Sequence, residues 1–466
     1  MGKRNEAEKL ERSLDNRHIQ LIALGGAIGV GLFYGSSSTI QMAGPAVLLS
    51  YLIGGFVIFT IMRALGEMAV EEPVSGSFSA YANRYLGPFA GYLTGWTYWF
   101  MWVVVGMAEL TVAGVYVNYW FPHIPQWVTA LVSLIVITLI NIFNVKAFGE
   151  FEFWFAMIKV VAIIAMIIFG LIIILFGIGN DGDPIGFTNL WLNGGFVPNG
   201  MIGILLSFVL VMFSFGGVEL VGITAGEARN PKKSIPAAVN SIVWRILIFY
   251  IAALGVMMSL YPWNEIGTEG SPFVLIFDKI GIPGAAHIIN FVVLTAALSA
   301  FNSGLYSSGR MLFNLALQSN GPKYFAKLNR YRTPRRGIVF SSSFLLVAVF
   351  LNYIVPEKVF LYISSIATVA VITSWTIILI TQLKFRKAKT SDEISRLSFK
   401  MPFYPISSYF ALAFLALVIV LMAFIEEMRV ALLVAPIWFI ILYIGYQLNK
   451  TKEKNRLEEE QVGSLK

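Results

Sequence analysis

Residues 19–62 decide the fold class. They read IQLIALGGAIGVGLFYGSSSTIQMAGPAVLLSYLIGGFVIFTIM, and none of these side chains is charged. At about 1.5 Å of rise per residue, a helix of this length would cover roughly two bilayer thicknesses. Glycine and proline interrupt helices, so Ala43-Gly44-Pro45 supplies a turn near the middle of the stretch. The stretch therefore predicts two membrane-spanning helices, because a charge at bilayer depth is costly and is avoided.

The whole chain has the composition of a polytopic membrane protein. Of its 466 residues 57% are hydrophobic and 13% are charged, whereas globular domains carry about 25% charged residues. Cysteine is absent and there are three histidines, so cysteine catalysis and a metal site are not expected. Ten further charge-poor runs bring the predicted number of spanning helices to twelve: residues 85–117, 127–145, 151–177, 199–225, 237–260, 284–317, 338–354, 359–382, 405–424 and 430–446.

The distribution of lysine and arginine predicts that both termini are cytosolic. Basic residues are concentrated in residues 1–18, in the tail 450–466 and in the loops after the sixth, eighth and tenth predicted helices. The opposite loops contain only Lys279, Lys358 and Arg429. Topology thus explains the net charge of +8, and no nucleic-acid partner is expected. Residues 1–17 are polar and charged, so no cleavable signal peptide is expected either.

Two predicted helices carry glycine clusters at their centres. Residues 25–33 read GGAIGVGLF and residues 213–222 read FSFGGVELVG, although each glycine costs a helix about 1 kcal/mol relative to alanine. Close helix packing is one explanation, and an unwound stretch facing a cavity is the favoured one. Interrupted helices at matching positions of two halves indicate a transporter site near the bilayer centre.

This symmetry predicts the organisation of the chain. Two inverted repeats of five helices would be followed by two further helices, with short cytosolic segments at both ends. The predicted boundaries are residues 1–18 for the N-terminal segment, 19–178 and 199–383 for the repeats, 401–449 for the last two helices and 450–466 for the tail.

Long motifs resemble the bacterial amino acid transporter branch of the amino acid–polyamine–organocation (APC) superfamily, which includes phenylalanine, aromatic, proline and alanine permeases. The resemblance covers nearly the whole chain and implies a LeuT-like five-plus-five fold, with helices 1 and 6 unwound at the midplane. It is carried by RHIQLIALGGAIGVGLF (17–33), GEMAVEEPVSGSF (66–78), MAELT (107–111), FGEFEFWFAMIK (148–159), MFSFGGVELVGITAGEARNPKKSIP (212–236), SPFVLIF (271–277) and LTAALSAFNSGLYSSGRML (294–312).

The resemblance also implies which residues bind the substrate. The α-carboxylate would bind backbone N–H groups around Gly29, Val30 and Gly31, and the α-ammonium would bind carbonyl groups of Ala27, Phe213 and Gly216. Phe213 and Phe215 would close over the substrate side chain. Many relatives have Thr or Ser where this chain has Val30, so one hydroxyl contact would be missing. The predicted binding set is completed by Ile28, Glu109, Gly217, Asn302 and Tyr306.

Ionisable residues inside the predicted spans are candidates for ion coupling. Lys159 lies about 12 Å into the fifth span and is predicted to carry a proton, as in proton-coupled relatives, with snorkelling to the interface as the alternative. Glu219 is equally consistent with a proton role and with a purely structural hydrogen bond. Glu109 is expected to face the pocket, and Arg63 and Glu67 are expected to form an i,i+4 ion pair.

One face of the eighth span carries Ser299, Asn302 and Tyr306. This face is expected either to line the pocket or to join neighbouring helices through polar contacts.

The predicted function is import of neutral L-amino acids by proton symport across the bacterial cell membrane, with aromatic substrates favoured. The alternatives are an amino acid exchanger and a permease for small neutral amino acids such as proline, alanine or serine. An enzyme is not expected, because no H-E-x-x-H and no G-x-x-x-x-G-K occurs. The expected partners are the amino acid, protons and membrane lipid, with the proton gradient in place of a cofactor.

Overall fold

The computed structural model describes residues 28–74, 76–143, 145–178, 182–223, 229–267, 271–280, 284–331, 333–356 and 358–464. Side chains are described for these residues except 143, 145–153, 223, 278–280 and 452–464. Within these ranges the regular structure is helical and contains no strand. The predicted all-α fold class is therefore confirmed.

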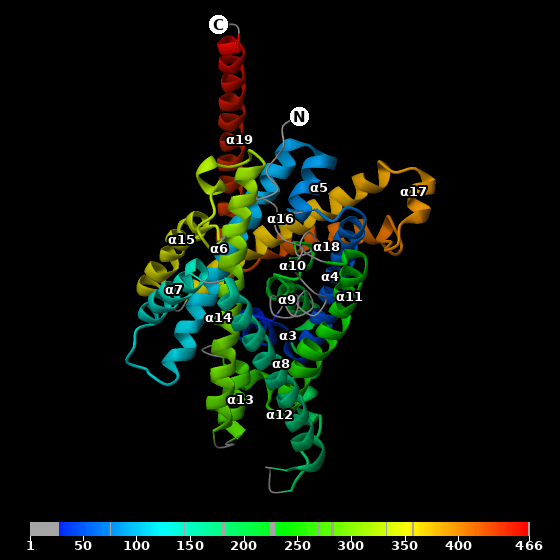
Figure 1. Cartoon of the computed structure of the whole chain (residues 1–466). Helices are drawn as coiled ribbons and strands as arrows, with labels where there is room; N and C mark the ends of the chain where they lie inside the picture. The colour runs from blue at the N-terminus through cyan, green and yellow to red at the C-terminus, as the bar shows by residue number, and fades with distance from the viewer. Residues whose placement is uncertain are drawn as a thin grey trace.

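The helices pack into a single elongated bundle (Figure 1). Their bounds are α2 Val30–Phe33, α3 Gly35–Ala43, α4 Val47–Glu71, α5 Ser77–Leu86, α6 Pro88–Asn118, α7 Gln126–Phe143, α8 Val145–Phe176, α9 Gly200–Ser214, α10 Leu220–Ile223, α11 Pro231–Arg245, α12 Ala253–Leu260, α13 Pro272–Ile280, α14 Ala285–Leu317, α15 Arg335–Ile354, α16 Val359–Lys387, α17 Ser391–Arg396, α18 Ile406–Met422 and α19 Arg429–Ser464. Short 3-10 segments include η2 Gly44–Ala46 and η7 Lys323–Ala326, and the π-helical segment η5 Ile246–Ala252 joins α11 to α12.

Many of these helices are apolar enough to cross a membrane. Among the described residues, eight helical stretches meet both the length and the hydropathy that a span needs. Three shorter apolar helices, Gln126–Ile142, Gly200–Ser214 and Ile406–Met422, accompany them. The chain is thus a multi-pass membrane protein, while the number of twelve spans stays a prediction.

The predicted turn after the first glycine-rich stretch is present. Helix α3 ends at Ala43 and α4 begins at Val47, with η2 between them. Gly44 has a φ of +61°, a left-handed conformation that glycine adopts without steric cost. The Gly-Pro signal therefore located this helix boundary correctly.

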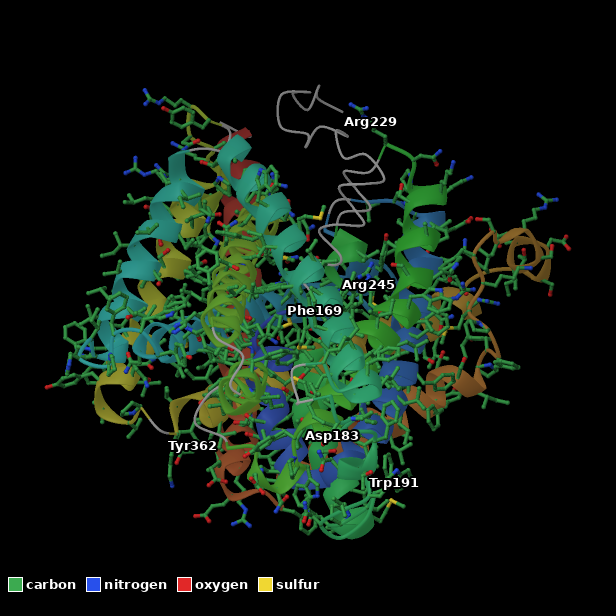
Figure 2. The ribbon with its side chains drawn as sticks, turned by 90° about the horizontal axis from the view of Figure 1, so that it is seen from below. Phe169, Asp183, Trp191, Arg229, Arg245 and Tyr362 are labelled. Atoms are coloured by element: carbon green, nitrogen blue, oxygen red, sulfur yellow. The ribbon has the colours of Figure 1, made fainter. Side chains whose placement is uncertain are left out.

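Three helices form the centre of the bundle. In α6, α14 and α16 the most apolar 18-residue window is 72% buried, against 33% in α8 and 17% in α19. Helix α6 packs against both α14 and α16. Phe169 on the outer side of α8 is 61% exposed (Figure 2), as expected for a side chain that meets lipid.

The bundle has two distinct ends. Helix α5 and the C-terminal part of α19 lie at one end, and α12 and α13 lie at the other (Figure 1). The connection between α8 and α9 contains Asp183 and Trp191 (Figure 2).

The ion pair expected between Arg63 and Glu67 is not the one that the structure shows. Both Glu67 carboxylate oxygens bind Arg386 of α16, with Arg386 Nε donating to Oε1 at 2.5 Å and Nη2 donating to Oε2 at 2.8 Å. The backbone N–H of Met401 also donates to Oε2. Arg63 instead stacks its guanidinium 3.7 Å from the ring centroid of Phe399. The prediction failed because residues far along the chain supply a two-pronged partner, which fits a carboxylate better than a neighbour on one helix.

Candidate functional site

The first glycine-rich stretch is not helical at Ile28 and Gly29, the first two residues that the structure describes. Ile28 and Gly29 precede α2, and Gly29 is extended with φ −129° and ψ −157°. The carbonyl of Gly29 accepts from the N–H groups of Leu32 and Phe33 at 3.2 and 3.3 Å, which starts the helix at Val30. Ala27 lies outside the described residues.

The second glycine-rich stretch contains a helix interruption. Helix α9 ends at Ser214, and α10 begins at Leu220. Between them Gly217 has a φ of +98°, which a residue with a side chain would adopt only under strain. The N–H of Gly217 donates to Glu219 Oε2 at 3.2 Å. The side chain of Glu219 thus satisfies a backbone group that the broken helix leaves free.

The two glycine-rich segments contact each other directly. The Ser214 hydroxyl lies within hydrogen-bond distance of two acceptors, the carbonyl oxygens of Gly31 and of Leu210 one turn back in α9, each at 2.9 Å. A Cβ atom built on Gly31 would lie 2.5 Å from Ser214 Cα, closer than two carbons can approach. Position 31 therefore needs glycine so that α2 and the end of α9 can meet backbone to backbone.

Two tyrosines support the contact from behind. Tyr250 donates its hydroxyl to the Ser214 carbonyl at 2.8 Å, and Tyr51 places its hydroxyl 3.4 Å from Ser214 Oγ. The ring of Phe215 packs on these same tyrosines, with centroid distances of 5.9 Å to Tyr51 and 5.0 Å to Tyr250. Phe215 therefore belongs to this packed cluster, and the structure does not bring it beside Phe213.

Phe213 belongs to a different group of aromatic rings. Its ring meets Phe360 of α16 edge to face at 6.0 Å, and Phe360 meets Tyr34 in the same way at 4.7 Å. The N–H of Gly216 donates to the Phe213 carbonyl oxygen at 3.0 Å, which closes the turn after α9. Tyr34, Phe213 and Phe360 form an uncharged wall, of which sequence reasoning found only Phe213. Tyr34 follows GVGLF directly, whereas Phe360 gave no signal in the sequence.

Glu109 of α6 reaches the first glycine-rich segment. Its Oε1 accepts from the Val30 N–H at 3.4 Å and would lie 2.7 Å from a Cβ on Gly29. Its Oε2 is buried and has no hydrogen-bond partner in the part of the chain that the structure describes. Buried polar atoms are nearly always hydrogen-bonded, so this oxygen is suited to accept from a proton donor that enters the site.

Lys159 of α8 is fully buried and approaches the same segment from another side. Its ammonium donates to the Ile28 carbonyl oxygen at 3.1 Å and to Ser299 Oγ of α14 at 3.4 Å. Its side chain thus ends in the protein interior. The snorkelling alternative required the ammonium to reach the membrane interface, and it does not. Lys159 joins α8 and α14 to the segment that precedes α2.

Glu219 lies in the second interruption among buried aromatic groups. In addition to Gly217, Trp375 of α16 donates to its Oε2 at 3.3 Å. Glu219 Oε1 is buried and has no hydrogen-bond partner among the described residues. The segment between α9 and α10 and helix α16 therefore supply the donors to this buried carboxylate.

The predicted face of α14 separates into three environments. Ser299 binds Lys159, as described above. Asn302 Oδ1 accepts from Asn141 Nδ2 of α7 at 2.8 Å, and Tyr306 lies under the guanidinium of Arg310 at 4.0 Å from its ring centroid. The structure thus brings only Ser299 to the first glycine-rich segment, while Asn302 joins two helices. Asn141 was not singled out from the sequence.

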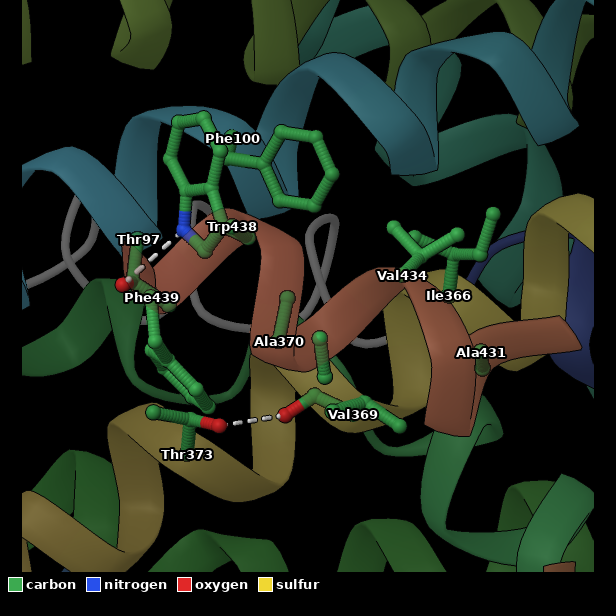
Figure 3. Close-up of a pocket in the computed structure, with 11 residues that line it drawn as sticks. Thr97, Phe100, Ile366, Val369, Ala370, Thr373, Ala431, Val434, Trp438 and Phe439 are labelled. Atoms are coloured by element: carbon green, nitrogen blue, oxygen red, sulfur yellow. Dashed lines mark hydrogen bonds between the residues drawn. The ribbon is translucent and has the colours of Figure 1, made fainter. Parts of the chain in front are cut away.

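A groove between α6, α16 and α19 is lined by apolar side chains (Figure 3). Trp438 stacks on Phe100 at 4.3 Å between centroids and donates to Thr97 Oγ1 at 3.4 Å. No charged residue lines this groove, and α19 is the least buried of the candidate spans in the described chain. We therefore interpret it as part of the surface that faces lipid, separate from the candidate site.

Comparisons with known proteins show one family over almost the entire chain. The family model "Amino acid permease" matches residues 18–459. Three Bacillus subtilis (strain 168) proteins are similar throughout. "Uncharacterized amino acid permease YtnA" is 55% identical over 97% of both chains, "Probable threonine/serine transporter YbxG" is 49% identical over 98% of this chain and 99% of its own, and "Amino-acid permease AapA" is 48% identical over 95% and 96%.

Proposed function

Because the chain belongs to the amino acid permease family, we propose that it is a secondary transporter that imports neutral L-amino acids across the cell membrane together with protons. The observation that carries the proposal is the fully buried Lys159 ammonium at the first glycine-rich segment of a permease. In this proposal both termini are cytosolic. The two interrupted stretches lie at matching positions of two inverted repeats and form the substrate site between them.

The zwitterionic end of the substrate binds the interrupted backbone. The α-carboxylate binds N–H groups of Gly29, Val30 and Gly31, because the start of a helix leaves such groups free. The α-ammonium binds carbonyl groups of Phe213 and Gly216, and that of Ala27. These contacts are the expectation from the family resemblance, and the direct contact between the two segments at Ser214 and Gly31 supports it.

Glu109 makes substrate binding sensitive to protonation. Its Oε1 accepts from the Val30 N–H, the group that the substrate carboxylate would take. Two carboxylates at one buried place repel each other, so a substrate carboxylate binds best when Glu109 carries a proton or turns away. Protonation of Glu109 would thus favour substrate binding, whichever residue carries the coupled proton.

Lys159 is the proposed proton carrier, with Glu219 as the second candidate. The Lys159 ammonium donates to the segment before α2 and to α14. When the ammonium loses a proton it becomes a neutral amine with fewer N–H donors, so its hydrogen bond to the Ile28 carbonyl weakens. Protonation can thus bias the position of the first helix, as alternating access requires.

The substrate class follows from the wall of the site. Val30, Tyr34, Phe213 and Phe360 carry no charge, which favours a neutral side chain over a basic or acidic one. The aromatic rings favour an aromatic or apolar substrate. A second candidate class is small hydroxyl amino acids, since a relative with 49% identity is named as a probable threonine/serine transporter.

Uptake into proteoliposomes tests the proposal. The purified chain is reconstituted, and a panel of labelled amino acids is offered under an inward proton gradient, with and without an uncoupler. We expect saturable uptake of one neutral class that collapses with the uncoupler and in Lys159→Ala. The exposed Lys384 of α16 provides the control variant Lys384→Ala. Uptake that ignores the gradient and requires internal amino acid would instead identify an exchanger.

A further inference from the structure

We propose that the buried pair Asn141 and Asn302 positions a water molecule that carries the proton of Lys159 towards the side of the membrane with the basic loops. This role rests on the proposed function, because it requires Lys159 to release a proton in each transport cycle. The asparagines act as positioning residues for that release.

The pair combines one free donor with one free acceptor. Asn141 is 3% exposed and Asn302 is 1% exposed, and Asn141 Nδ2 donates to Asn302 Oδ1 at 2.8 Å. Asn141 Oδ1 and Asn302 Nδ2 have no hydrogen-bond partner within the described ranges. A single water can donate to the first atom and accept from the second, and buried waters occupy such places in proteins.

Asn302 lies one helical turn after Ser299, the residue of α14 that Lys159 contacts. The Lys159 ammonium donates to Ser299 Oγ at 3.4 Å. Residues three apart on a helix share a face and are separated by about 4.5 Å of rise. Asn302 therefore follows Ser299 as the next polar group on the face that Lys159 contacts.

Polar groups also lie between the end of α7, next to Asn141, and the protein surface. Asn141 is close to the end of α7, and the carbonyl of the next residue, Ile142, accepts from Asn329 Nδ2 at 3.0 Å and from Thr333 Oγ1 at 3.3 Å. Asn329 is partly exposed and belongs to the connection from η7 to α15, which contains Lys327 and Arg330. By the positive-inside rule this connection is on the cytosolic side.

The proton leaves Lys159 through one hydroxyl group and one water molecule. The Lys159 ammonium gives one proton to the Ser299 hydroxyl oxygen while the hydroxyl gives its own proton to the water at the pair. The water then releases a proton towards the side of the membrane at which α7 ends, and Lys159 is left as a neutral amine. The asparagine side chains gain and lose no proton.

A purely structural role predicts something different. The same bond would then only connect α7 with α14, as polar groups do between membrane helices. Losing such a connection weakens every step of the cycle. Losing a proton relay slows only net transport, because exchange of one substrate molecule for another can proceed while Lys159 stays protonated.

The test compares Asn141→Val with Asn141→Thr in the full chain in proteoliposomes. Valine and threonine side chains have nearly the same shape, and only threonine has a hydroxyl group that can bind the water. For Asn141→Val we expect gradient-driven net uptake to fall by roughly 100-fold, the lower range for loss of positioned proton transfer, while exchange of the same substrate is unchanged. Asn141→Thr should recover most of the net uptake.

A matched control is available on α14. Asn290 is 1% exposed and its Nδ2 donates to the Tyr116 carbonyl at 2.8 Å, so it is a buried asparagine that joins α14 to α6. Asn290→Ala should change net uptake and exchange by the same factor. Asn141→Leu, a third substitution of similar size, replaces Asn141→Val if the latter does not fold.

Three outcomes overturn the inference. The first is that exchange falls by the same factor as net uptake in Asn141→Val. The second is that the valine and threonine variants show the same net uptake. The third is that Asn141→Val retains the gradient-driven net uptake of the wild type. In a separate case, wild-type uptake that ignores the proton gradient refutes the proposed function itself and with it the need for a relay.

Discussion

The ammonium nitrogen of Lys159 lies 3.1 Å from the carbonyl oxygen of Ile28. On the same segment, the Gly31 carbonyl accepts from Ser214 at 2.9 Å and the Val30 N–H donates to Glu109. Residues 28–31 are thus connected by hydrogen bonds to α8, α9 and α6. Small changes at these residues should therefore alter transport more than changes of the same size elsewhere.

Gly29→Ala is expected to abolish substrate uptake while the protein still assembles. The added Cβ would lie 2.7 Å from Glu109 Oε1 and 3.5 Å from the Ala300 Cβ. The carboxylate must move, and with it the bond to the Val30 N–H. Uptake in proteoliposomes and the elution volume in detergent measure the two effects.

Gly255→Ala in α12 is the control for this substitution. A Cβ there meets only Leu48 Cδ1 at 3.8 Å, an ordinary contact, and alanine favours the helix by up to about 1 kcal/mol. We expect normal uptake and an unchanged or higher thermal midpoint. Equal uptake in the two alanine variants would contradict a specific role for the space at Gly29.

Ser214→Ala should weaken substrate binding about fivefold, because it removes a hydrogen bond worth roughly 1 kcal/mol that holds the two glycine-rich segments together. Gly31 would keep its backbone position but lose the donor to its carbonyl. The concentration of unlabelled substrate that halves uptake gives the affinity. Ser343→Ala removes a similar hydroxyl on the exposed face of α15 and should leave that value unchanged.

The sequence pointed to those residues of the candidate site whose local chemistry is unusual. Clusters of glycine in residues 25–33 and 213–222 mark stretches where helical hydrogen bonding is weak, and Lys159 stands out because a charge in an apolar run is rare. Partners in the structure were harder to predict. Phe360 and Asn141 look like ordinary residues of apolar helices, and they reach the site region only through packing of α16 and α7.

Glu67 illustrates the same limit. Its nearest basic neighbour on the helix is Arg63, so the periodicity of α4 favours that pair. The guanidinium of Arg386, more than three hundred residues later, takes the carboxylate instead. Only the packing of α16 on α4 creates this pair, and no pattern within a helix could indicate it.

Breaking the Glu67–Arg386 pair should strongly destabilise the fold. The two side chains are 0% and 7% exposed, and removal of one partner leaves the other charge buried, at a cost of about 3–5 kcal/mol. We expect a lower thermal midpoint in detergent for Glu67→Gln and for Arg386→Met. The double variant should be less unstable than the sum of the two, and additive losses would mean that the charges do not interact.

Glu219→Gln separates the two roles considered for this carboxylate. Both donors to Glu219, the Gly217 N–H and the Trp375 indole, bind Oε2, and the amide oxygen of glutamine can accept from both. If Glu219 mainly satisfies these donors, Glu219→Gln keeps gradient-driven uptake while Glu219→Ala loses it, because alanine leaves a buried N–H without a partner at a cost of roughly 1–3 kcal/mol. This is the result that we expect. Uptake that loses its dependence on the proton gradient in Glu219→Gln, with exchange intact, would instead make Glu219 the proton carrier, since an amide occupies the same place but cannot be protonated at the pH of the assay.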